Sequence, residues 1–197
     1  MKITLMKNQI LASLRLSAFC GMFFAFPFFC AAQEAPSRQE ICPQNDCRKA
    51  STVELRTKEG KKFIKSFEFA PPILQDGLIT VLAGETVFIE AARLGEQLGD
   101  LHVVPKNLHP EKTIVLKLEQ MENRVAMMFT LFNPFPALLK FEIGIQTLDR
   151  QAPIKVKSCP VPAGKEGYEG WEEPVFQVFL RNGRFLPKDT REVEGCS

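Results

Sequence analysis

The chain has two histidines, His102 and His109, and they are its most versatile candidates for chemistry. Histidine is a common general base near neutral pH and a frequent ligand of zinc or copper. His102 lies in the apolar run Leu-His-Val-Val, and His109 precedes Pro110 in a polar connection. No His-x-His or His-x-x-x-His pair gathers ligands on one face. We therefore expect both histidines to be structural or solvated, with no metal site and no cofactor.

Nucleophilic and acid catalysis also lack a recognisable motif. The chain contains neither a Gly-x-Ser-x-Gly elbow nor a glycine-rich phosphate loop. Acid pairs such as Glu172 with Glu173, or Glu192 with Glu194, are typical of a solvated edge or tail, because acid catalysis needs a desolvated carboxyl group in a cleft. We predict no catalytic residues, and a hydrolase with an unrecognised site is one alternative.

Tyr168 and Trp171 are the only tyrosine and tryptophan, and the expected loop Ala163–Trp171 contains both. An exposed aromatic pair on such a loop would stack on a sugar or anchor a protein partner. The competing interpretation is that Trp171 closes the open end of the core, since a large aromatic side chain has much apolar area to bury. We favour the structural role and keep Tyr168 and Trp171 as a candidate binding loop.

An apolar run from Leu16 to Ala32 follows Lys2, Lys7 and Arg15, which is the layout of a secretory signal peptide over residues 1–32. Cleavage is expected after Ala32, with the working protein in the periplasm or secreted. An uncleaved anchor is the alternative, although a span needs about 20 apolar residues. A lipid on Cys20 or Cys30 is less favoured, because a bulky phenylalanine precedes each cysteine.

Four cysteines remain after that cleavage, namely Cys42, Cys47, Cys159 and Cys196. An even number in an oxidising compartment favours disulfides, and three connectivities are possible. We favour Cys42 with Cys47 and Cys159 with Cys196. Zinc is the alternative for the same residues, but the usual paired Cys-x-x-Cys knuckles are absent.

The charge balance argues against a nucleic-acid partner. Of 25 basic residues, three lie in the leader. The remaining 22 basic residues nearly balance 23 acidic residues, and the two kinds are interspersed along the chain. A nucleic-acid-binding protein would instead show a basic patch or stripe. The expected leader is the only membrane-spanning candidate, so we expect no stable span after cleavage.

Short runs rich in valine, isoleucine, leucine, phenylalanine and threonine dominate the chain after a polar lead over residues 33–50, and glycine, proline, asparagine and aspartate separate them. The apolar alternation is clearest in Leu139, Phe141, Ile143 and Ile145. We predict strands over residues 51–57, 62–69, 78–82, 86–92, 101–104, 113–120, 125–132, 138–147, 154–158 and 174–181.

Helix formers cluster over residues 89–98 and 118–128 and compete with this interpretation. Alternation on both sides of Met121–Arg124 favours a hairpin in the second of these regions. Asn133–Pro136 must then be a connection, because two prolines do not fit inside a central strand. The pattern predicts an all-β fold, an immunoglobulin-like antiparallel β-sandwich, as a single domain over residues 51–197.

The C-terminal third shows a more specific resemblance. Ser158-Cys159-Pro160-Val161, followed by Trp171 and Pro174, resembles a C-terminal signature of uncharacterised secreted bacterial proteins. Asn133 followed by Leu139-Lys140-Phe141 is similar to their upstream strand and connection. The resemblance implies an extracytoplasmic address and this fold, and it implies no activity.

Taken together, these features favour a secreted or periplasmic protein that binds rather than catalyses. The first hypothesis is an envelope-assembly accessory whose exposed strand edge pairs with a strand of an envelope protein. The second is a carbohydrate or envelope-polymer binder that uses Tyr168 and Trp171, with polysaccharide as the partner. The third is the hydrolase.

Overall fold

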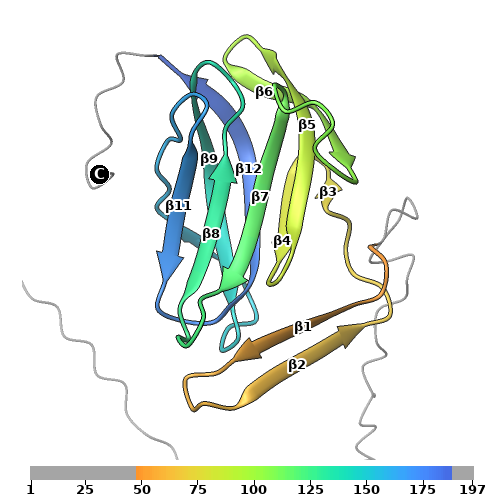
Figure 1. Cartoon of the computed structure of the whole chain (residues 1–197), viewed down its shortest axis with the longest axis vertical. Coiled ribbons are helices and arrows are strands. Elements are labelled where there is room, and N and C mark those ends of the chain that lie inside the picture. The colour runs from red at the N-terminus through yellow and green to blue at the C-terminus, as the bar shows by residue number, and fades with distance from the viewer. Residues whose placement is uncertain (1–47, 188–197) are drawn as a thin grey trace, which may run out of the picture. The chain divides into compact units, whose positions relative to one another are not determined.

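The computed structural model describes residues 48–187, and all regular secondary structure in this range is β-strand (Figure 1). The expected signal peptide over residues 1–32, most of the expected lead, and Cys42, Cys47 and Cys196 lie outside the described residues. The strands are β1 (Ser51–Arg56), β2 (Lys62–Phe67), β3 (Leu74–Gln75), β4 (Leu78–Leu82), β5 (Thr86–Leu94), β6 (Gln97–Val104), β7 (Thr113–Gln120), β8 (Met127–Phe132), β9 (Leu138–Thr147), β10 (Ile154–Val156), β11 (Glu166–Trp171) and β12 (Val175–Leu186).

The strands form two layers that face each other (Figure 1). The hydrogen bonds form one ten-stranded sheet, in which β12 links the group β10-β9-β12-β4-β3 to the group β6-β5-β7-β8-β11, and a separate two-stranded sheet of β1 and β2. Every described pairing is antiparallel. The all-β, antiparallel fold class predicted from the spacing of strands and turns is therefore confirmed.

Alternation along the strands builds the core between the layers. In β9, Leu139, Phe141, Ile143 and Ile145 are buried while their neighbours are partly exposed. β8 repeats this pattern, because alternate residues of a strand point to opposite faces. The hairpin predicted between residues 113 and 132 is confirmed, since β7 pairs with β8 from Val115–Phe132 to Gln120–Met127.

β12 joins the two layers. Its first half pairs with β4, whereas farther along Arg184 pairs with Gln97 of β6. The pairing of β12 with β9 slips between Arg181 and Arg184, where Asn182 has a φ of 53°. A Cβ at Gly183 would lie 2.7 Å from the ring of Phe141, so the close approach of the strands there requires glycine. This bulge directs the strand from one layer to the other.

On the opposite side, Asn133 closes the sandwich. Its side-chain amide donates hydrogen bonds to the carbonyl oxygens of Ala137, Val161 and Pro162, at 2.7, 2.9 and 3.1 Å. Its side-chain oxygen accepts from the Phe135 N–H at 3.0 Å. Asn133 is fully buried, and these bonds satisfy its amide group. The connection after β8, predicted as irregular, is thereby tied to the segment that leads into β11.

The β1–β2 hairpin covers one end of β12. Phe63 and Phe67 of β2 lie 6.2 and 5.8 Å from Phe176, measured between ring centroids. Val53 and Leu55 of β1 are buried in the same core. A turn joins the strands predicted over residues 51–57 and 62–69, since the Thr57 N–H donates to the Lys61 carbonyl at 2.8 Å.

Two strands were not predicted from the sequence, and β6 and β12 are longer than the predicted runs over residues 101–104 and 174–181. The segment expected to be the loop Ala163–Trp171 contains β11, which pairs with β8 over six residues. Three glycines concealed this strand from a propensity argument. β3 has only two residues and makes a hairpin with β4 through Asp76 and Gly77, whose φ angles are 50° and 75°. Positive φ at both central residues is the requirement of a type I′ turn.

Candidate functional site

The candidate site is the open groove between β3 and β6. β3 is the last strand beside β4, and β6 pairs with β5 along its length but with β12 only at Gln97. One part of the groove, about 710 Å³, is lined by Pro72, Leu74, Gln75, Asp76, Gly77, Leu98, Gly99, Asp100, Leu101 and His102. A second part, about 440 Å³, is lined by Arg48, Pro72, Ile73, Leu74, Leu101, His102 and Val103. Four shared residues make the two parts continuous.

The edge of β6 that faces the groove is available for pairing. At its start, Gln97 pairs with Arg184, and the Phe185 N–H donates to the Glu96 carbonyl at 2.7 Å. From Leu98 to Val104, no described strand pairs with this edge, and β5 occupies the other one. Backbone groups along such an edge form a template for an additional strand.

The groove has an apolar floor and acidic rims. Leu74, Leu98 and Leu101 pack partly against the core, while Val103 is 43% exposed. Asp76 stands on the β3 side and Asp100 on the β6 side, and both are exposed. Neither carboxylate forms an ion pair with another described residue. The arrangement suits a ligand that is apolar along one side and carries positive charge.

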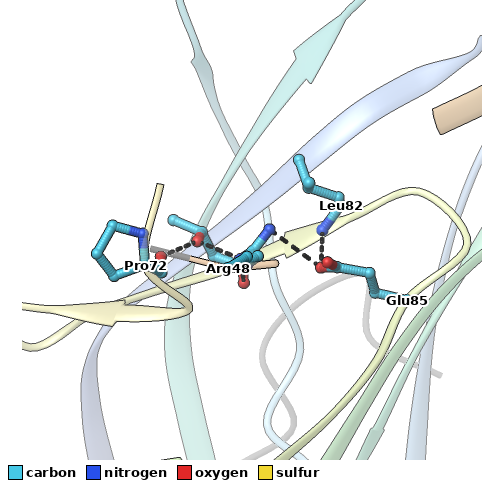
Figure 2. Close-up of polar contacts among 5 residues, drawn as sticks. Arg48, Pro72, Leu82 and Glu85 are labelled. Carbon is cyan, nitrogen blue, oxygen red and sulfur yellow. Dashed lines mark hydrogen bonds and ion pairs between the residues drawn. The ribbon is translucent and has the colours of Figure 1, made fainter. Parts of the chain in front are cut away.

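Arg48 holds the wall of the groove beside β3 (Figure 2). Its side chain is 5% exposed, and its guanidinium forms an ion pair with Glu85 at 3.1 Å. The same group donates to the backbone carbonyl of Thr80 and, at 2.6 Å, to its hydroxyl oxygen. That hydroxyl donates to the Pro72 carbonyl at 2.8 Å. The network therefore fixes Pro72, which lines both parts of the groove.

Glu85 ties Arg48 to the turn after β4. The Glu85 carboxylate oxygen that faces Arg48 also accepts from the Leu82 N–H at 2.8 Å. Burial lowers the pKa of Arg48, and the Glu85 charge opposes that effect. The guanidinium stays protonated, as arginine does throughout folded proteins. Arg48 thus acts as a fixed cation that joins three backbone segments.

The structure separates the two aromatic residues of the candidate binding loop. Tyr168 is 61% exposed, whereas Trp171 is half-buried, packs against the core and lies 6.5 Å from Phe129 between ring centroids. Residues three apart on a strand point to opposite faces. The Tyr168 hydroxyl donates to the Glu166 carboxylate, and this bond raises the pKa of Tyr168. The two rings therefore do not form one stacking platform.

Cys159 is the only cysteine among residues 48–187, and it is not a free thiol. Its backbone N–H donates to the Glu169 carboxylate at 3.0 Å. The cysteines that it could pair with after cleavage, Cys42, Cys47 and Cys196, lie outside the described residues. The pairing of Cys159 with Cys196 therefore stays a prediction.

Both histidines lie near Glu90, since His102 is the strand partner of Glu90 across β5 and β6. His109 is 3.9 Å from Glu90 and from Glu111, and Lys112 forms a 2.7 Å ion pair with Glu90. The bond from Lys112, together with the nearby histidines, lowers the pKa of Glu90. Among the described residues, no group of three or more histidine, cysteine, aspartate or glutamate side chains is arranged to hold a metal ion.

Comparison with known proteins gives no family for this chain: no family model, curated protein or solved structure matches it. Over the part of the chain that the structure describes, no helix has the length and apolar character needed to cross a membrane.

Sequence analysis did not identify the groove. The signal for its β3 wall was the Asp76-Gly77 pair between Leu74-Gln75 and Leu78, which is typical of a two-residue hairpin. Arg48 carried no signal, because its partners are 32 and 37 positions away in the chain. Only the fold brings these residues together.

Proposed function

We propose that the protein is an extracytoplasmic, non-catalytic binding protein, an envelope-assembly accessory that accepts an extended strand from a partner protein. The observation that carries this proposal is the edge of β6 from Leu98 to Val104, which pairs with no other described strand and lies beside a groove lined by both leucine and polar side chains. In such binding, main-chain hydrogen bonds supply affinity, and side-chain pockets supply selectivity. The leader-like N-terminus supports an address outside the cytoplasm.

The groove offers both a strand edge for main-chain hydrogen bonds and a surface for the side chains of a bound strand. An added strand would pair with the backbone of β6 and place alternate side chains over Leu74, Leu98 and Leu101. The Arg48 network holds the opposite wall before a partner arrives, so that binding orders few protein groups. A disulfide from Cys159 to Cys196 would further restrain the C-terminal tail in an oxidising compartment.

Val103→Lys provides a test in the full-length protein. Lysine is a natural means of blocking an exposed strand edge, and Val103 is exposed enough for its charge to reach water. The probe is a short peptide of alternating valine and threonine, with binding measured by fluorescence anisotropy. We expect Val103→Lys to weaken binding about tenfold or more, since a clash in a pocket costs more than 1 kcal/mol.

Ile64→Lys is the matched control, because Ile64 is an exposed apolar residue, 58% accessible, on strand β2. It should leave peptide binding unchanged. Equal binding by the parent, Val103→Lys and Ile64→Lys would overturn the proposal. Loss of binding in the Ile64→Lys variant alone would also overturn it, because the acceptor edge would then be β2.

Hydrolysis is a second candidate function, because Asp76 and Asp100 line the same part of the groove from different walls. Glycosidases use two carboxyl groups on either side of a scissile bond. Both of these carboxyl groups are exposed, whereas a general acid usually needs a desolvated environment. Turnover of a polysaccharide or peptide panel by the parent protein, lost in both Asp76→Asn and Asp100→Asn, would favour hydrolysis over binding.

A further inference from the structure

The charge distribution around the groove restricts what kind of strand it accepts. Its lining includes two carboxylates, Asp76 and Asp100, and one histidine, His102. The cation that borders the groove, Arg48, has its side chain buried and paired with Glu85. Among the described residues, neither Asp76 nor Asp100 has an ion-pair partner. Without the expected leader, the chain has 22 basic and 23 acidic residues, so its overall charge is close to zero and the negative charge at this rim is a local feature.

The two carboxylates are also fixed by the backbone. Asp76 occupies the two-residue turn between β3 and β4, with a φ of 50°. Asp100 has a φ of 49° and lies where the pairing of β6 with β5 slips between Glu90 and Ala92. Aspartate and asparagine tolerate this left-handed conformation better than other non-glycine residues. Asparagine is therefore a faithful replacement that removes only the charge.

The negative charge of the two aspartates is confined to one end of the groove. Asp76 and Asp100 line the part beside Leu98, whereas the part beside Val103 is lined mainly by apolar residues, including Pro72, Ile73 and Leu101. A bound strand would thus meet an acidic rim at one end of its path and an apolar surface at the other. This asymmetry fixes which part of the strand carries the complementary charge.

On this basis, and resting on the strand-accepting function proposed above, we infer that the partner of the groove is a basic, amphipathic strand of another protein. Its apolar side chains cover the floor, and a lysine or arginine side chain reaches the rim formed by Asp76 and Asp100. Exposed ion pairs add modest affinity, but they discriminate strongly against the opposite charge. Main-chain hydrogen bonds therefore provide most of the affinity, and the acidic rim selects strands that carry positive charge.

The test compares three short acetylated peptides in which valine alternates with lysine, glutamine or glutamate. With the parent protein at low salt, we expect the affinity order lysine, then glutamine, then glutamate. Each neutral variant, Asp76→Asn or Asp100→Asn, should reduce the lysine-over-glutamate preference by about two- to fivefold, as expected for an exposed ion pair. Salt should reduce the preference in the parent.

Glu122→Gln is the control, because Glu122 is an exposed acid in the turn between β7 and β8 and does not line the groove. It should retain the full preference. The inference is overturned if the parent binds the lysine and glutamate peptides equally, or if Glu122→Gln lowers the preference as much as Asp76→Asn does. The proposed function would survive either result if Val103→Lys still abolished binding, and it would fail separately if Val103→Lys had no effect.

Discussion

The two flanks of the sandwich are built in different ways. On one flank, the buried side chain of Asn133 bonds to three carbonyl groups, and the Leu139 N–H donates to the Val161 carbonyl at 3.0 Å. On the other flank, β3 and β6 face each other across a groove, and no backbone hydrogen bond joins them among the described residues. The first flank is closed by the protein itself, whereas the second is left to solvent or a partner.

This difference separates stability from binding. Buried polar groups need hydrogen-bond partners, so the closed flank depends on a few specific side chains. Exposed edge groups are satisfied by water until a strand replaces it. We therefore expect substitutions at the closed flank to act on stability, and those at the rim of the open flank to act on binding.

Asn133→Ala should be the most destabilising of these changes. It removes three donated hydrogen bonds and the acceptor of the Phe135 N–H in a buried site. We expect a loss of about 3–4 kcal/mol, because buried polar groups left without partners cost 1–3 kcal/mol each and neighbouring losses are not fully additive. Urea unfolding measures the change. A loss below about 1 kcal/mol would mean that the flank is not closed by this residue.

Trp171→Ala should have the next largest effect, a loss of about 2–3 kcal/mol, since the ring is half-buried against Phe129. Tyr168→Ala, on the outward face of the same strand, is the matched control and should change stability by less than about 0.5 kcal/mol. Thermal unfolding and polysaccharide binding are measured on both variants. Lost polysaccharide binding with an unchanged melting temperature in Trp171→Ala would favour the carbohydrate hypothesis.

Arg48→Met should cost about 2 kcal/mol, because it leaves Glu85 without its cation and Thr80 without a donor. This loss of stability is smaller than the loss expected for a fully buried ion pair, since the Glu85 side chain is 25% exposed. The double variant Arg48→Met with Glu85→Gln should recover part of the loss, because the two residues are coupled. Strictly additive losses in the double-mutant cycle would contradict this interpretation.

The sequence could predict features set by local alternation, but not features set by tertiary pairing. Local alternation located β8 and β9 within one or two residues, because each strand buries one face. The glycines at 164, 167 and 170 hid β11, whose pairing with β8 is a tertiary effect. The groove could not be predicted, because Arg48, Asp76 and Asp100 are distant in the sequence and line one groove only through the order of the strands. Trp171 packs partly against the core, and its strand β11 was not predicted from the sequence.

Amide hydrogen exchange along β6, with and without the valine–lysine peptide, shows whether β6 accepts an added strand. Exchange is slowed where a backbone N–H becomes hydrogen-bonded, so a strand added to this edge should protect amides between Leu98 and Val104. We predict clear protection there upon peptide binding, with β11 and β2 unchanged. Peptide binding without protection in β6, or with protection of another edge strand, would contradict the claim that β6 is the acceptor.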